Sequence, residues 1–137
     1  MKVQNLIARA LRLIQAIDPQ QPVKASDMET GIDALNGMMA RIEADGTALG
    51  WSPVANPSDD LPLADEMTQA IAYNLAITLA PEYGVTPLPT VVGMALTGME
   101  ALLRDVAVAT PIQPILSVPT PSYKSGRTIN GESWYVG

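Results

Sequence analysis

The placement of proline near the carboxyl end limits most tightly what this chain can fold into. Residues 111–121, PIQPILSVPTP, hold four prolines in eleven positions. Proline fixes φ and removes a backbone donor, so such a run does not fit the interior of a helix. We therefore predict a semi-rigid, polyproline-like strap from residue 111 onward, and a folded core that ends near residue 110.

Upstream of this run, apolar residues recur at helical spacing in four segments. The pattern predicts helices over residues 3–17, 26–45, 64–80 and 89–108. The third segment is apolar on several sides, which indicates a helix with more than one neighbour. The stripe of the fourth comprises Val92, Ala95, Leu96, Met99, Leu102, Leu103 and Val106. Gly93 and Gly98 interrupt that helix, either to let another helix approach or as tolerated weak points.

Helix-capping and helix-terminating residues predict where these helices begin and end. Ser26 and Glu29 fit a capping box at the start of the second helix. Asp18-Pro19 is expected to end the first helix, since a residue before proline avoids the helical region. Gly46 can take the left-handed conformation that closes the second.

Residues 46–63, GTALGWSPVANPSDDLPL, are rich in proline and glycine and predict turns. Residues 49–54 within them are interpreted as a short extended arm or one limb of a hairpin. Leu49, Trp51 and Val54 are the candidate contact residues of this arm, and the family resemblance described below implies a neighbouring subunit or a tail protein as their partner.

These observations together predict an all-α fold, a small antiparallel bundle of about four helices. A short extended arm joins the second and third helices, and a long proline-rich tail follows the bundle. Residues 1–110 are expected to form the helical core and residues 111–137 the extended tail.

Composition excludes several classes of function. The chain has no cysteine and no histidine, so a disulfide scaffold, a Cys/His metal site and histidine acid–base chemistry are impossible. Its net charge of −6 argues against a protein that grips nucleic acid through phosphate contacts. The amino-terminal stretch carries charges within its apolar pattern, so we expect neither a signal peptide nor a membrane span.

Carboxylate pairs are the remaining candidates for catalysis. They are Glu43 with Asp45, Asp59 with Asp60, and Asp65 with Glu66. A glycosidase needs two carboxyl groups across a sugar, one of them with a raised pKa. No pocket motif accompanies these pairs, and turn or helix-terminus positions explain them structurally. We expect no enzyme activity, no cofactor and no metal.

The tail carries an unusual concentration of apolar and aromatic side chains. Trp134, Tyr135 and Tyr123 are half of the six aromatic residues of the chain. Trp and Tyr are common anchors of interfaces, and an extended prolyl segment loses less entropy on docking. The tail is therefore a candidate docking segment for another protein. The alternative is that its apolar residues pack back onto the helices of the same chain. Its assigned contact residues are Ile112, Ile115, Leu116, Val118, Tyr123, Lys124, Arg127, Trp134 and Tyr135.

Three stretches carry a resemblance to a known family. They are LNGMMARIEADGTALGW at residues 35–51, NLAITLAPEYGV at residues 74–85 and the terminal ESWYVG. In their order and spacing they resemble the head-to-tail adaptor of short-tailed bacteriophages, also called the packaged-DNA stabilisation protein or tail accessory factor. The resemblance extends over nearly the whole chain.

The resemblance implies a virion protein at the head–tail junction, made in the host bacterial cytoplasm. It implies a ring, typically of twelve copies, beneath a portal protein on which the tail docks. It also implies that the ring extends a channel for double-stranded DNA without binding it specifically, helps retain that DNA, and receives tail, nozzle or needle proteins. Two alternatives stay open: a peptidoglycan-degrading virion enzyme that uses a carboxylate pair, and a non-viral helical interaction module.

Overall fold

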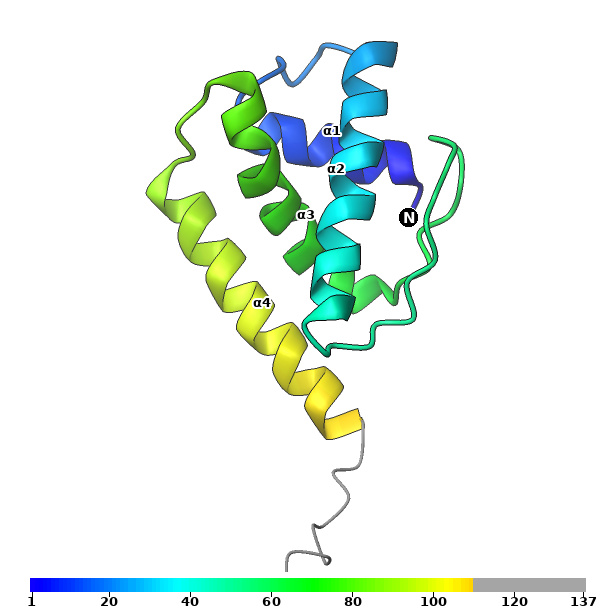
Figure 1. Cartoon of the computed structure of the whole chain (residues 1–137). Helices are drawn as coiled ribbons and strands as arrows, with labels where there is room; N and C mark the ends of the chain where they lie inside the picture. Colours follow the sequence, from blue (N-terminus) through cyan, green and yellow to red (C-terminus); the bar gives the residue numbers. More distant parts are fainter. Residues whose placement is uncertain (110–137) are drawn as a thin grey trace, which may run out of the picture.

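The computed structural model describes the backbone of residues 1–109 and the side chains of residues 1–107. Four α-helices and one short 3-10 helix follow one another in this part of the chain (Figure 1). They are α1 (Val3–Leu13), α2 (Ala25–Ala44), α3 (Asp65–Leu79), η1 (Ala80–Tyr83) and α4 (Pro89–Ala109). The predicted all-α class and the number of long helices are confirmed.

Helix α3 is the centre of the packing. It contacts α1, α2 and α4, which is why its sequence is apolar on more than one side. Its buried residues, Ala70, Ile71, Ala72, Leu75, Ala76 and Leu79, alternate small and branched side chains. The expectation of several neighbours for this helix is confirmed. Helix α4 lies at the edge of the molecule and packs mainly against α3 (Figure 1).

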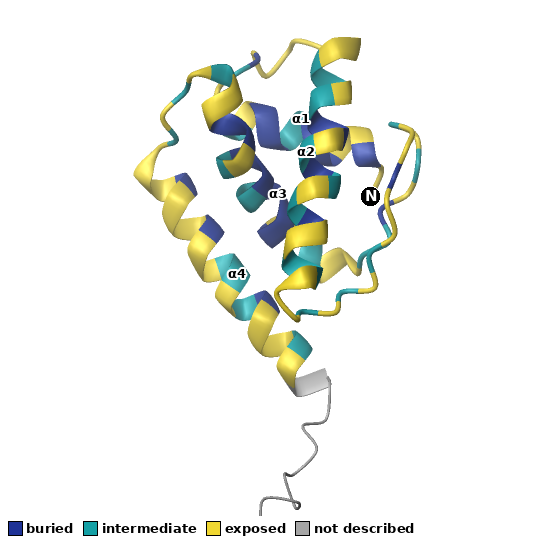
Figure 2. Ribbon diagram, in the orientation of Figure 1, coloured by how far each residue is buried: buried dark blue, intermediate teal, exposed yellow. Residues whose placement is uncertain are grey.

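The core contains only aliphatic side chains and methionine. Its largest fully buried members are Val3, Leu6, Ile7, Leu11, Ile14, Leu35, Met39, Ile71, Leu75 and Leu79. No polar or charged residue is buried among the described residues. Figure 2 shows the buried positions of α1, α2 and α3 turned toward one another, whereas most of α4 is exposed.

Helix α1 ends at Leu13, four residues before the predicted end at Ile17. The chain reverses at Gln15, whose φ of 60° is left-handed and unusual for a residue other than glycine. The backbone N–H groups of Gln15 and Ala16 then donate to the carbonyl oxygens of Arg12 and Leu11 at 3.0 and 2.9 Å. This pair of bonds is a Schellman motif, and it stops the helix before Asp18-Pro19 is reached. Ile17 still lies in the core.

The predicted capping box at the start of α2 is wrong. The helix begins at Ala25 after Lys24, so Ser26 lies inside the first turn and no side chain caps the helix. The first turn closes through the backbone, because the N–H of Met28 donates to the carbonyl oxygen of Lys24 at 2.9 Å. At the other end, Gly46 has a φ of 102°, which confirms the predicted left-handed residue after the helix.

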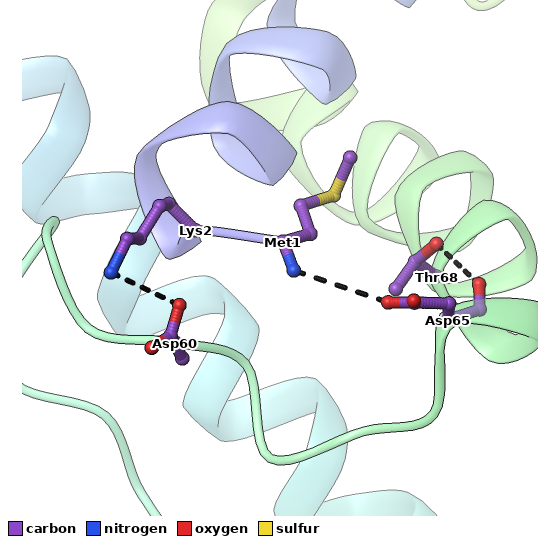
Figure 3. Close-up of polar contacts among 5 residues, drawn as sticks. All are labelled: Met1, Lys2, Asp60, Asp65 and Thr68. Atoms are coloured by element: carbon purple, nitrogen blue, oxygen red, sulfur yellow. Dashed lines mark hydrogen bonds and ion pairs between the residues drawn. The ribbon is translucent and has the colours of Figure 1, made fainter.

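The segment between α2 and α3 contains no strand, so the hairpin alternative for residues 49–54 is wrong. It is fastened instead to the start of the chain. The N–H groups of Val3 and Gln4 donate to the carbonyl oxygens of Asp59 and Pro57, at 3.0 and 2.9 Å. Exposed ion pairs, Lys2 with Asp60 at 3.0 Å and the Met1 ammonium with Asp65 at 4.0 Å, lie beside this contact (Figure 3).

Two glycines allow helices to approach closely. A β-carbon at Gly98 of α4 would lie 3.1 Å from both the α- and β-carbons of Ala70 on α3. A β-carbon at Gly31 of α2 would collide with the side chain of Ile7 on α1. Gly93 has no such neighbour within 4 Å. Of the two alternatives for the glycines of α4, close approach therefore holds for Gly98 and tolerated weakness for Gly93.

Candidate interaction surfaces

Helix α4 carries two apolar rows, one residue apart, and the described chain covers them to different extents. The inner row, Val91, Ala95, Gly98 and Leu102, repeats with spacing 4-3-4 and faces α3. The outer row, Val92, Leu96, Met99 and Leu103, repeats with the same spacing. A 4-3 repeat of apolar residues is the pattern by which one helix packs along another.

Three of the four residues of the outer row are exposed, and Met99 is half-buried against the core. Leu96 is 61% exposed and Leu103 42%, whereas Ala95 and Leu102 of the inner row are 3% exposed. The predicted stripe combined the outer row with Ala95 and Leu102 of the inner row, and the structure separates these two sets. The stripe is wider than the face that α3 can cover, and its outer half remains at the surface. Large exposed apolar side chains gathered on one helix are typical of a protein interface.

A polar contact fixes the angle at which α4 presents this row. The side-chain amide of Asn74 on α3 donates to the carbonyl oxygens of Ala70 and Ala95, at 2.8 and 2.9 Å. It thereby joins α3 to α4 close to Gly98. In the sequence, Asn74 lies among the apolar positions Ala70, Ile71 and Leu75 of this helix, and a polar residue at such a position is the only sequence signal for this role.

A second surface is a groove between α2 and the connecting segment. It has a volume of about 890 Å³, and Met28, Ile32 and Val54 supply its apolar lining. Glu29 and Asp33 stand at its rim and are exposed. One wall is rigidly placed, because the side-chain amide of Asn36 exchanges two hydrogen bonds with the backbone of Val54, at 2.8 and 3.0 Å. Nothing in the sequence pattern indicated this role of Asn36.

The three candidate residues of the arm all pack against their own chain. Val54 is buried at 7% exposure, and Leu49 and Trp51 are half-buried against the core. The carboxylate of Glu43 accepts hydrogen bonds from the backbone N–H groups of Leu49 and Trp51 at 3.0 and 3.3 Å. Residues 49–54 thus lie along α2. Their assignment to a contact with another subunit or a tail protein stays a prediction.

The carboxylates considered for catalysis have contacts within the fold, except Glu66, for which the structure gives only a position in the first turn of α3. Asp45 pairs with Arg41 at 3.3 Å, and Asp60 pairs with Lys2. Asp59 accepts the backbone N–H groups of Asn56 and Ala55 at 2.9 and 3.2 Å, and these bonds hold the pKa of its carboxyl below the usual value. Asp65 and Glu66 lie in the first turn of α3, where acidic residues favour the helix dipole.

A tyrosine joins the end of the third helical segment to the start of the second. The Tyr83 hydroxyl donates to the carboxylate of Asp27 at 2.9 Å. Burial, together with this hydrogen bond, raises the pKa of Tyr83 to about 12. The contact links η1 to the first turn of α2.

The assigned docking residues of the tail lie outside the described residues. They are Ile112, Ile115, Leu116, Val118, Tyr123, Lys124, Arg127, Trp134 and Tyr135. Their role therefore stays a prediction, as does the division of the chain at residue 110.

Among residues 1–109, no group of three or more acidic side chains is placed to hold a metal ion. None of the helices in the same part of the chain is long and apolar enough to span a membrane.

Comparison with models of known protein families gives a match over almost the entire chain. Residues 5–137 match the family described as P22 tail accessory factor. The matched range includes most of α1, all of α2, α3 and α4, the segment that lines the groove, and the proline-rich residues that follow α4.

Proposed function

The chain belongs to the P22 tail accessory factor family, and from this premise we propose that it is a structural head-to-tail connector of a tailed bacteriophage. In this role, several copies form a ring below the portal protein at the head–tail junction of the virion. The ring extends the DNA channel, helps retain packaged DNA and offers the attachment site for tail proteins.

The observation that carries this proposal is the extent of the family match. It runs through both the helical core and residues 111–137, so the candidate docking tail is part of what the family has in common with this chain. The tail combines prolines with Trp134 and Tyr135, which suits an extended segment that buries aromatic anchors on a partner.

Two further observations support a connector. The exposed outer row of α4 offers an apolar surface for protein contact. The net charge of −6 suits a channel through which double-stranded DNA slides without being held. The carboxylates considered for a wall-degrading reaction are engaged in backbone and ion-pair contacts, so no observation favours the enzyme alternative.

A truncation tests the proposal. The chain ending at residue 110 should bind purified portal rings at least about tenfold more weakly than the full chain, since the tail supplies anchor residues. Its helical content should stay unchanged, because the core of residues 1–109 is buried among its own helices. Portal binding measured by co-sedimentation provides the comparison, and circular dichroism provides the control.

Substitutions at single positions distinguish the contribution of Trp134 and Tyr135 to portal binding from that of the rest of the tail. Trp134→Ala with Tyr135→Ala should also weaken portal binding, whereas Lys124→Ala should matter less. Undiminished portal binding by the truncated chain would refute tail docking. Failure of the full chain to bind portal rings would refute the connector role itself.

A further inference from the structure

We propose that copies of this chain associate head to tail, with the outer row of α4 in one copy seated in the α2 groove of the next. The outer row is Val92, Leu96, Met99 and Leu103, and the α2 groove is the one lined by Met28, Ile32 and Val54. The inference rests on the proposed connector function, and it names the two surfaces through which the ring closes.

The two surfaces lie on opposite sides of the molecule. In Figure 1, α4 forms the left edge, and the segment between α2 and α3 runs along the right side of α2. The groove is bounded by that segment and by the first half of α2. A contact between different surfaces on opposite sides is heterologous, and repeating it generates a ring when the rotation between copies closes. A self-complementary contact would instead stop at two copies.

The dimensions of the surfaces agree. The part of α2 that lines the groove runs from residue 25 to residue 36, a length of about 17 Å at the rise of an α-helix. The outer row, from residue 92 to residue 103, covers the same number of turns and hence also about 17 Å. Its 4-3-4 spacing is that of a helix which packs along another helix. In the proposed contact, the helix along which the outer row packs is α2 of the next copy, at the residues that line the groove.

The charges beside the two surfaces are complementary. Arg104 follows the last residue of the outer row, is exposed, and has no ion-pair partner among residues 1–109. Glu29 and Asp33 line the groove, and neither of them has an ion-pair partner in that part of the chain. An exposed cation facing two carboxylates steers association and fixes its orientation more than it adds affinity.

A two-fold contact between α4 helices is the rival arrangement. The spacing 4-3-4 reads the same in both directions, so an antiparallel pair would place Val92 opposite Leu103 and Leu96 opposite Met99. Such a pair leaves the α2 groove and its two carboxylates without a role. The heterologous contact uses both surfaces and is therefore the arrangement proposed.

Disulfide crosslinking tests the two arrangements directly, because the chain has no cysteine of its own. One full-length protein carries Leu96→Cys and a second carries Met28→Cys, and both are mixed on portal rings under mild oxidation. The heterologous contact predicts crosslinked pairs only in the mixture. The two substitutions in one chain should give a ladder of linked copies. Crosslinking of the Leu96→Cys protein with itself, without pairs in the mixture, would establish the two-fold contact and overturn the proposal.

A charge substitution provides an independent test with a matched control. Leu96→Glu should weaken association of copies on the portal at least about tenfold, because it buries an unpaired charge in the contact. Met94→Glu changes another exposed apolar residue of α4, at 45% exposure, outside the outer row, and should have little effect. Circular dichroism of both variants checks that the helices persist.

The outcomes separate this inference from the proposed function. If wild-type copies form rings on the portal and the mixed pair does not crosslink, the interface is wrong and the connector role stands. If Met94→Glu is as harmful as Leu96→Glu, the outer row has no special part and the interface is also overturned. If the wild-type protein forms no ring on the portal, the proposed function fails and this interface fails with it.

Discussion

The side-chain amide of Asn74 in α3 lies 2.9 Å from the carbonyl oxygen of Ala95 in α4 and donates a hydrogen bond to it. The contact crosses from one helix to the other among otherwise apolar side chains. It fixes how far α4 is rotated against α3, and therefore which of its two apolar rows is left at the surface.

Removing this amide should loosen α4. Asn74→Ala should lower the free energy of unfolding by about 1–2 kcal/mol, because two hydrogen bonds to backbone carbonyls are lost in a partly buried site. Thr78→Ala removes an exposed hydroxyl that bonds only the backbone of its own helix, and should change stability by less than about 0.5 kcal/mol. Urea denaturation measures both. Equal effects of the two substitutions would show that the contact with Ala95 contributes nothing.

Substitution by alanine at the two glycines of α4, Gly93 and Gly98, should change the stability of the fold in opposite directions. Gly98→Ala should destabilise the fold by roughly 1–3 kcal/mol, because the added methyl group meets the backbone of α3 at Ala70 and the helices must separate. Gly93→Ala has open space around it and should stabilise the fold by up to about 1 kcal/mol through helix propensity. Thermal unfolding monitored by circular dichroism compares them. A gain in stability for Gly98→Ala would show that the two helices are not in close contact there.

The left-handed residue after α1 is another position where glycine should matter. Gln15 adopts a φ of 60°, which disfavours a residue with a β-carbon, so Gln15→Gly should raise the free energy of unfolding by about 0.5–1 kcal/mol. Gly46 has a φ of 102°, and Gly46→Ala should lower stability by about 1 kcal/mol for the converse reason. Chemical denaturation at neutral pH gives both values. A destabilising Gln15→Gly would contradict the left-handed turn.

The contact between Tyr83 and Asp27 predicts a dependence on alkaline pH. Folding raises the pKa of Tyr83 from its ordinary value near 10 to about 12, so the folded state favours the protonated phenol. The stabilisation is therefore complete below pH 10 and is lost as the pH rises from about 10 to 12. Tyr83→Phe should cost about 0.5–1.5 kcal/mol at neutral pH, with a difference from wild type that shrinks across this window.

Denaturation at several pH values measures this change, and tyrosinate absorbance follows the titration itself. The wild-type chain should show one tyrosine that ionises later than the others, and the Tyr83→Phe chain should lack it. A difference in stability that stays constant up to pH 12 would argue against the hydrogen bond.

The carboxylate of Glu43 should hold the segment that follows α2. Glu43→Ala removes the acceptor of the Leu49 and Trp51 N–H groups and should lower stability by about 1–3 kcal/mol. Asp45→Ala breaks an exposed pair with Arg41 and should change stability by less than about 0.5 kcal/mol. In a Trp134→Phe background, the fluorescence of Trp51 should become more accessible to a quencher only in the Glu43 variant. Unchanged quenching would mean that the segment is held by other contacts.

Periodicity predicted the helices well because each has an apolar face that must be buried. The ends were harder to predict, since backbone hydrogen bonds decide them. The early end of α1 depends on a left-handed Gln15, and the start of α2 on a backbone turn at Lys24, neither of which has a side-chain signal. The outer row of α4 could be found from the sequence only as part of one wide stripe. Packing against α3 divides that stripe, and packing is a property of the whole fold.

The roles of the Asn36 and Asn74 side-chain amides could not be predicted from the sequence either. Each bonds a backbone group far away in sequence, so nothing in the neighbouring residues indicates its partner. The family resemblance indicated the overall role, which the match over residues 5–137 supports at the level of a tail accessory factor. The tail residues and the arm contacts remain predictions.

The hydrogen bonds between the first residues and the segment before α3 also have a consequence for folding during synthesis. Val3 and Gln4 bond Asp59 and Pro57, and the apolar face of α1 packs on α3, which comes later still. On the ribosome, the first helix therefore emerges before most of the surface that receives it has been made. Helix α2 can cover part of its apolar face, but the remainder stays open to chaperones or to neighbouring nascent chains until the third helix has been synthesised.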